Sequence, residues 1–153
     1  MDIAKYLILG DELETLISRI YLKVAAITHN NLTSNALIKI SHEELNHAST
    51  LKMGKNYLKE APDIFHGVDI DEAELQQGLK DCKELYERIH PMSSVLSCLI
   101  SLLDLEKRFE KIHLGASVIV SDAHLKRLFQ ALAGGDQNHF KVLQEMISDG
   151  TAH

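Results

Sequence analysis

Apolar positions in the first part of the chain recur at the spacing of an α-helix. Between residues 3 and 29 the apolar side chains fall three or four positions apart, at Leu13, Leu16, Ile17, Ile20, Val24 and Ile27. This period predicts an amphipathic helix over residues 3–29. The polar run NNLTSN then predicts a turn, with Thr33 or Ser34 as the N-cap of a second helix over residues 35–59.

The last third of the chain predicts another pair of long helices. Pro91 precedes a helical pattern over residues 92–118, and Ser121 or Asp122 offers an N-cap for a helix over residues 122–149. Gly150 stands where a glycine commonly ends a helix. Because only a short turn separates the two helices of each pair, we expect each pair to be antiparallel.

A longer connection lies between the two pairs. Residues 61–70 contain Pro62 and read as a loop, and Asp71 with Glu74 forms a capping box for a shorter helix over residues 72–89. A connection of this length can cross a helical bundle from end to end. The sequence therefore predicts one all-α domain over residues 1–153, a four-helix bundle with a helix-containing crossover between the second and third long helices.

An internal repeat relates the two pairs of long helices. A displacement of 92 residues places Glu14 on Glu106, Glu44 on Asp136 and His47 on His139. Apolar positions follow the same displacement, with Leu13 on Leu105, Ile17 on Phe109, Ile20 on Ile112 and Leu51 on Leu143. The repeat therefore covers core positions and polar positions together.

The repeated polar residues are an acid followed three residues later by a histidine. That spacing alone is weak, since Glu87 and His90 share it outside the repeat. Chance does not readily supply two copies in register, each of them 30 residues after an acid on the preceding helix. Side chains three apart on a helix lie on the same face, so an acid and a histidine in this pattern can reach one metal ion.

The four repeated acids fall near the middle of their helices, where a bundle is driest. Counted from the turns, the two acids of each hairpin lie at about the same height. Buried carboxylates without partners are costly. Two divalent cations would balance four carboxylates, so the pattern predicts two metal ions bound by acids and histidines from four helices.

This set of residues resembles the ligands of the ferritin-like di-metal carboxylate proteins, particularly the rubrerythrin type. Those proteins carry one Glu on each of two helices and a Glu-x-x-His on each of the other two. The matching residues are Glu14, Glu44, His47, Glu106, Asp136 and His139, and Tyr21 follows Glu14 at the family's spacing. The resemblance implies a ferritin-like four-helix bundle that binds two iron ions, with manganese or zinc as alternatives.

The chain departs from the family pattern at two positions. Asp136 replaces a Glu and is one methylene shorter, which predicts unequal metal sites. Phe109 stands where many rubrerythrins have a second Glu, so the resemblance does not extend to peroxide reduction by an iron ion that changes position. The rubredoxin module is also absent, so an enzyme of this type would need an external electron donor.

The resemblance implies a protein that reacts Fe(II) with O2 or peroxide, as a peroxidase, an oxidase or a ferroxidase. Two alternatives remain open from the sequence: a metal-free structural or regulatory bundle, and a subunit of an iron-storage cage. A homodimer or larger homo-oligomer is expected. Metal analysis, with an optical spectrum before and after exposure to air, would distinguish a protein that oxidises Fe(II) from a metal-free bundle.

Several other residues have simpler interpretations. Tyr21 is either a hydrogen-bond donor to a metal ligand or a packed core residue. His113, which the repeat pairs with Tyr21, reads as a packed or partly exposed histidine rather than a seventh ligand. The remaining histidines read as surface residues: His29, His42, His66, His90, His124 and His153.

Composition narrows the classes of protein. The net charge of −6 and the lack of a basic stripe argue against a nucleic-acid partner. No apolar run is long enough to predict a membrane span, and the first residues do not read as a signal peptide. The only two cysteines, Cys82 and Cys98, fit a reducing compartment, so we expect a cytoplasmic protein.

Overall fold

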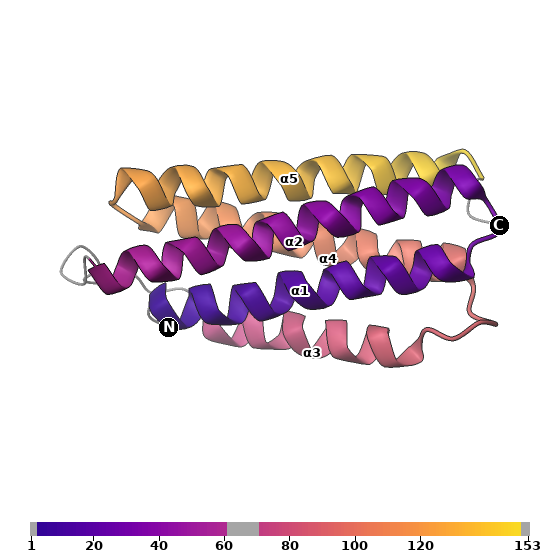
Figure 1. The fold of residues 1–153 in the computed structure, drawn as a ribbon, viewed down its shortest axis with the longest axis horizontal. Helices are drawn as coiled ribbons and strands as arrows, with labels where there is room; N and C mark the ends of the chain where they lie inside the picture. Colours follow the sequence, from indigo (N-terminus) through magenta and orange to yellow (C-terminus); the bar gives the residue numbers. More distant parts are fainter. Residues whose placement is uncertain (1–2, 61–70, 151–153) are drawn as a thin grey trace.

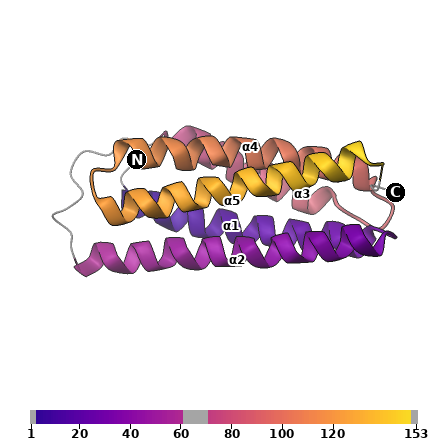
Figure 2. The same cartoon turned by 90° about the horizontal axis from the view of Figure 1, so that it is seen from above.

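Four long helices and one shorter helix lie side by side along a common axis (Figures 1 and 2). The computed structural model describes residues 3–60 and 71–150, and within these ranges every regular element is an α-helix. The helices are α1 (Ile3–Ile27), α2 (Asn31–Glu60), α3 (Glu72–Arg88), α4 (Val95–Ile119) and α5 (Ala123–Ser148). The predicted all-α class is confirmed, as is the predicted connecting helix before α4.

The connections fix the direction of each helix. Short turns join α1 to α2 and α4 to α5, so each of these pairs is antiparallel and packs along its length. Helix α3 returns along α1 from the end where α2 finishes to the end where α4 begins (Figure 1). As a consequence, α2 and α4 run in the same direction. The predicted loop over residues 61–70 lies outside the described residues.

The start of α2 differs from the prediction. The side chain of Asn30 accepts hydrogen bonds from the backbone N–H groups of Leu32 at 2.9 Å and Thr33 at 3.1 Å. Asparagine is among the strongest N-caps, and α2 therefore begins at Asn31 rather than at residue 35. The predicted caps were wrong, because Thr33 is buried inside the helix and the Ser34 hydroxyl donates to the carbonyl of Ala25.

The other helix ends follow the sequence more closely. Asp71 and Asp122 cap α3 and α5 through their carboxylates, and Gly150 takes the left-handed conformation (φ 64°) just beyond α5. Helix α4 begins at Val95 with Ser94 as its cap, later than the predicted residue 92, because Pro91 lies in a turn. Gly134 and Gly135 do not interrupt α5.

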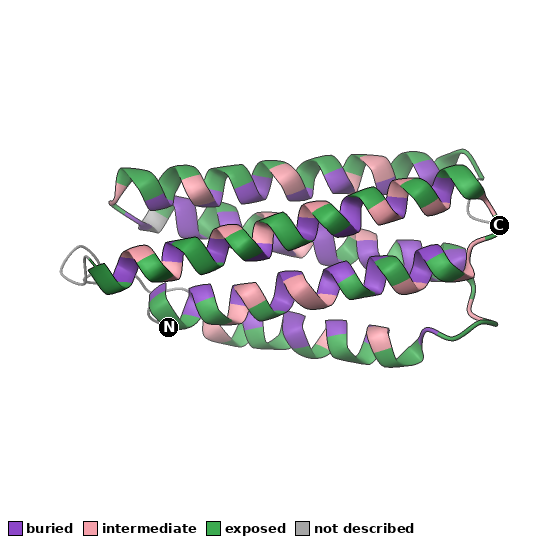
Figure 3. Ribbon diagram, viewed as in Figure 1, coloured by how far each residue is buried: buried purple, intermediate pink, exposed green. Residues whose placement is uncertain are grey.

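Each helix turns one face toward the interior and leaves the opposite face exposed (Figure 3), and most of the buried side chains are apolar. Among the largest fully buried side chains are Tyr6, Tyr21, Phe109 and Phe129. Both cysteines are buried and free. No helix within the described ranges combines the length and the apolar character needed to cross a membrane. The most unusual feature of this interior is the number of charged groups that it contains.

Candidate metal centre

All six residues predicted as metal ligands lie in the same region of the interior, where five of them are buried and His47 is partly buried. They come from the four long helices: Glu14 from α1, Glu44 and His47 from α2, Glu106 from α4, and Asp136 and His139 from α5. The exposed fractions of Glu14, Glu44, Glu106 and Asp136 are 1%, 1%, 2% and 1%. Four carboxylates within one dry core confirm the expected burial.

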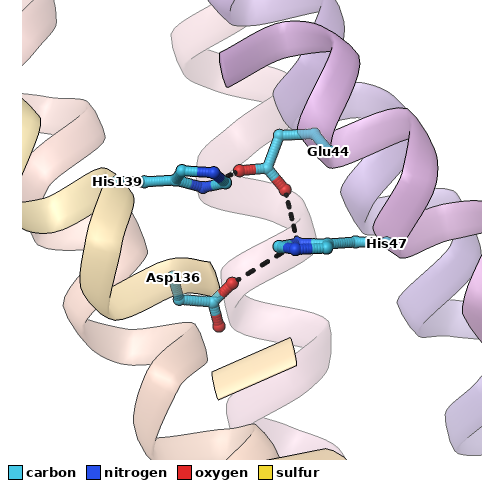
Figure 4. Close-up of side chains that lie close together, drawn as sticks. All are labelled: Glu44, His47, Asp136 and His139. Atoms are coloured by element: carbon cyan, nitrogen blue, oxygen red, sulfur yellow. Dashed lines mark ion pairs between the residues drawn. The ribbon is translucent and has the colours of Figure 1, made fainter. Parts of the chain in front are cut away.

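Two histidine nitrogens face the carboxylates from opposite sides (Figure 4). His47 Nδ1 lies 3.2 Å from Glu44 Oε2, 3.7 Å from Asp136 Oδ1 and 3.9 Å from Glu14 Oε2. His139 Nδ1 lies 2.5 Å from Glu44 Oε1 and 3.7 Å from Glu106 Oε1. Glu44 therefore offers one oxygen to each histidine, and four side chains (Glu44, His47, Asp136 and His139) place one ligand atom each within reach of a single cation.

Within the described residues, several buried atoms of this cluster lie in ion-pair range of one another but make no hydrogen bond of good geometry. They are both carboxylate oxygens of Glu44, Oδ2 of Asp136, Nδ1 of His47 and Nδ1 of His139. Buried polar atoms are rarely left unpaired in proteins, and an unpaired set of this kind points to a bound ion or water. Carboxylate oxygens and neutral imidazole nitrogens are the ligands that Fe(II), Mn(II) and Zn(II) accept. The cluster therefore fits a bound metal ion.

The electrostatics of the cluster also favour a cation. Burial, followed by the repulsion of Glu44, raises the pKa of Glu14 to about 7. Burial and the charges of Glu14, Glu106 and Glu44 raise the pKa of Asp136. For His139, burial acts to lower the pKa, but the neighbouring carboxylates of Glu106 and Glu44 outweigh it and raise the value to about 11. The site attracts positive charge, whether protons or metal ions.

His113 is packed in the interior, which is one of the two places that the sequence suggested for it, and it lies beside this cluster. It is 1% exposed, and its Nε2 lies 3.0 Å from Glu14 Oε1 and 3.6 Å from Asp136 Oδ2. Its Nδ1 lies 2.6 Å from the hydroxyl of the fully buried Tyr6. Glu14, His113 and Asp136 form a second group whose atoms lie within reach of one cation.

The repeat contains a signal that identifies His113. Tyr21, which corresponds to His113 under the displacement of 92 residues, donates its hydroxyl to Glu106 Oε1. His113 in turn contacts Glu14, which corresponds to Glu106. The two residues therefore occupy equivalent places, each against the acid of the opposite repeat. Of the two interpretations of Tyr21, the structure therefore supports a hydrogen-bond donor to a predicted ligand.

A further acid, Glu43, supports His139 from outside. His139 Nε2 lies 3.0 Å from Glu43 Oε2, so the ring is held between this carboxylate and the inner cluster. A carboxylate on the outer nitrogen fixes the orientation and tautomer of a metal-binding histidine. Sequence reasoning missed Glu43, because a polar residue beside Glu44 looks like an ordinary exposed helix position.

Among the described residues no carboxylate supports His47 in this way, because the repeat is broken at the corresponding position. The residue equivalent to Glu43 is Gly135, and a Cβ atom at that position would overlap the ring of His47. Gly135 therefore lets α5 approach His47 closely, whereas a Cβ atom at Gly134 would meet open space.

A surface pocket of about 260 Å³ opens beside this contact. Its lining residues are Glu43, Asn46, His47, Gly135, Asn138 and His139. The two asparagines, which the repeat also relates, are exposed and lie at this pocket. The pocket connects solvent to the two histidines that face the carboxylates.

The histidines that the sequence assigned to the surface are exposed where the structure describes them: His29, His42, His90 and His124. His66 and His153 lie outside the described residues.

Comparison of the chain with protein-family models, with curated proteins and with solved structures finds no match. The buried cluster is therefore the feature of this protein that bears on its function.

Proposed function

We propose that this protein is a ferritin-like di-metal carboxylate protein of the rubrerythrin type, which binds two iron ions and reacts Fe(II) with O2 or peroxide. Glu14, Glu44, Glu106 and Asp136 would hold the pair through carboxylate oxygens, and His47 and His139 through Nδ1. The observation that carries the proposal is the set of buried ligand atoms without hydrogen-bond partners, centred on Glu44.

The arrangement of helices supports the same proposal. A ferritin-like di-metal site needs one acid from each of two helices and an acid with a histidine from each of the other two. Helices α1 and α4 supply the single acids, and α2 and α5 supply the pairs. Helix α3 lies against α1 and α4 and contributes none of these residues, as expected of a crossover segment.

A metal-free structural module fits the cluster less well. Without cations the fold would bury four carboxylates together, and such groups are costly to bury unless they are paired or neutralised. Two divalent ions would balance the four negative charges.

The choice of iron follows from the resemblance, since the ligand types also suit manganese and zinc. Bound iron would supply the electrons that reduce the oxidant. The chain would hold the ligands in place, keep bulk water from the core, and admit a small oxidant through the pocket beside Gly135. Phe109, which replaces a Glu of many rubrerythrins, is buried with its ring against Gly78 of α3.

Oxidation of bound Fe(II) tests this function directly. The protein is loaded with Fe(II) under nitrogen and desalted, and air or peroxide is then added while the remaining Fe(II) is measured with a chelating dye. We expect faster loss of Fe(II) than in protein-free buffer, with a new near-ultraviolet absorption. Two bound Fe(II) ions that oxidise no faster than free Fe(II) would instead indicate a structural metal site.

Gly135→Ala should weaken metal binding through its contact with His47. The added Cβ atom overlaps the His47 ring, so the ring must leave its place beside Glu44. We expect the affinity for the ion at His47 to fall about tenfold or more, as other disturbances of ligand orientation do. Titration of the metal-free protein with Fe(II) under nitrogen measures this change.

Gly134→Ala is the matched control for this substitution. Its Cβ atom meets open space, so metal binding should be unchanged. Alanine also favours the helix by about 0.5–1 kcal/mol relative to glycine, which should raise the melting temperature slightly. Equal metal affinities in the two variants would show that His47 is not a ligand.

A further inference from the structure

The carboxylates of Glu14 and Asp136 are each divided between two histidines. Glu14 Oε2 and Asp136 Oδ1 face His47 Nδ1, at 3.9 and 3.7 Å. The other oxygens, Glu14 Oε1 and Asp136 Oδ2, face His113 Nε2, at 3.0 and 3.6 Å. Glu44 is divided in the same manner between His47 and His139. Shared carboxylates thus join the group around His47 and His139 to a further group around His113.

The position at His113 has its own unpaired ligand atom. Asp136 is 1% exposed, and its Oδ2, which faces His113, makes no hydrogen bond. A buried carboxylate oxygen that lacks a donor but lies 3.6 Å from an imidazole nitrogen is in a suitable place to share a cation with it. This observation is independent of the atoms around His139.

We propose that Glu14, His113 and Asp136 form a third divalent-cation position beside the pair held by the six residues named above, an inference that rests on the proposed function. In this state His113 binds through Nε2, and its Nδ1–H donates to the hydroxyl oxygen of Tyr6. Such a hydrogen bond on the outer nitrogen orients a metal-binding histidine. Tyr6 is therefore a positioning residue for the third cation.

Charge balance makes this position weaker than the other two. Two divalent ions already balance the four buried carboxylates, so a third brings two uncompensated positive charges close to the first pair. We expect its affinity to be lower by about tenfold or more. A readily exchanged ion next to a tightly held pair suits an ion in transit to or from the pair.

The equivalent place in the other repeat offers no such position. There Tyr21 replaces His113 and donates its hydroxyl to Glu106, so it acts as a hydrogen-bond donor and presents no imidazole nitrogen. The third position therefore lies at the end of the cluster that contains His113. The two repeats therefore differ in two ways at the cluster: Asp136 replaces the Glu found at position 44, and His113 replaces the Tyr found at position 21.

Binding of Zn(II) tests the proposal without any redox reaction. The metal-free protein and its His113→Gln variant are titrated with Zn(II) against a competing chelator, and wild-type crystals soaked in Zn(II) are examined by anomalous scattering. Glutamine can still donate a hydrogen bond to Glu14 but offers no imidazole nitrogen. We expect two tight ions and one weaker ion in the wild type, with anomalous density at His113 Nε2, and only the two tight ions in the variant.

The outcomes separate this inference from the proposed function. Two tight ions with no third ion in titration or crystals would overturn the inference, since His113 would then only donate a hydrogen bond to Glu14. Three ions in the His113→Gln variant would overturn it as well. Fewer than two tight ions in the wild type would count against the metal pair, whereas density at His113 alone would support the third position without the pair. The crystal result stands even if the variant fails to fold.

Discussion

Loading the protein with Fe(II) under nitrogen should raise its melting temperature by about 10 °C at pH 8 and by much less at pH 5. Ions that bind only the folded state stabilise it by about 4 kcal/mol when their concentration is a thousand times the dissociation constant. For a chain of this size, each kcal/mol shifts the melting temperature by roughly 2–4 °C. The rise in melting temperature is expected to be larger at pH 8 because the metal-free protein is less stable there than at pH 5.

The metal-free protein should lose stability as the pH rises from 5 to 8. The folded-state pKa of Glu14 is raised from 4.5 to about 7, mainly by burial, so the folded state binds the proton more tightly than the unfolded state. Stability therefore falls as the pH rises through this range, by about 2.5 kcal/mol for Glu14 taken alone. The raised pKa of Asp136 acts in the same direction.

The histidines add to this trend. The pKa of His139 is raised to about 11, so its stabilising charge is fully present below about pH 6.5 and is lost progressively as the pH rises from there toward 11. His47 shifts in the same direction, because the carboxylates of Glu44 and Glu14 outweigh the effect of burial. Metal ions replace these protons, and their binding strengthens as the pH rises.

Melting curves of chelated and loaded samples at both pH values measure the effect. The exposed variant His90→Ala serves as the control and should show the wild-type pattern. A metal-free protein that is as stable at pH 8 as at pH 5 would contradict the claim that the buried carboxylates and histidines bind protons more tightly in the folded state. A metal-induced shift that is no larger at pH 8 than at pH 5 would contradict the exchange of protons for metal ions.

Glu44→Gln should abolish tight binding of both ions. Glu44 is the residue whose two oxygens face both His47 and His139, and neither oxygen has a hydrogen-bond partner. Its replacement by an amide removes a charged ligand from each position. Loss of an outer hydrogen-bond partner alone costs 10–100-fold in metal affinity, so we expect a loss of more than about 100-fold here.

Glu87→Gln is the matched control, because Glu87 also precedes a histidine by three residues but is exposed on α3. Metal content after anaerobic loading with Fe(II) and desalting compares the variants. The control should retain the wild-type content, and Glu44→Gln should retain little. Similar losses in both variants would show that metal binds at the surface. Full retention of iron by Glu44→Gln would show that Glu44 is not a metal ligand.

Much of the fold is readable from the sequence, because apolar periodicity and capping side chains are local signals. Asp71, Asp122 and Gly150 mark helix ends as expected. Asn30 was missed because the polar run around it contains several residues that are good caps, and only the hydrogen bonds show which one acts. The prediction of a ferritin-like bundle goes further than the observed all-α class and stays a proposal.

The six candidate ligands can be predicted from the repeat. Its two copies place acids and histidines at equivalent positions along the helices, so that they lie at the same level of the bundle. The contact of His113 with Glu14 is not predicted when His113 is considered alone, and it becomes clear only from the equivalent contact of Tyr21 with Glu106. The contrast between Glu43 and Gly135 was beyond sequence reasoning. It depends on how closely α2 and α5 approach at His47 and His139.

The amount of iron that the native protein retains tests the central claim most directly. Protein freed of metal by a chelator is loaded with excess Fe(II) under nitrogen and desalted, and metal and protein are then quantified by mass spectrometry and amino-acid analysis. The buried cluster of four carboxylates with His47 and His139 predicts two tightly held Fe(II) ions per chain, a weaker third ion being lost on desalting. A chain that retains no iron, although its helices remain folded, would contradict the proposed metal centre.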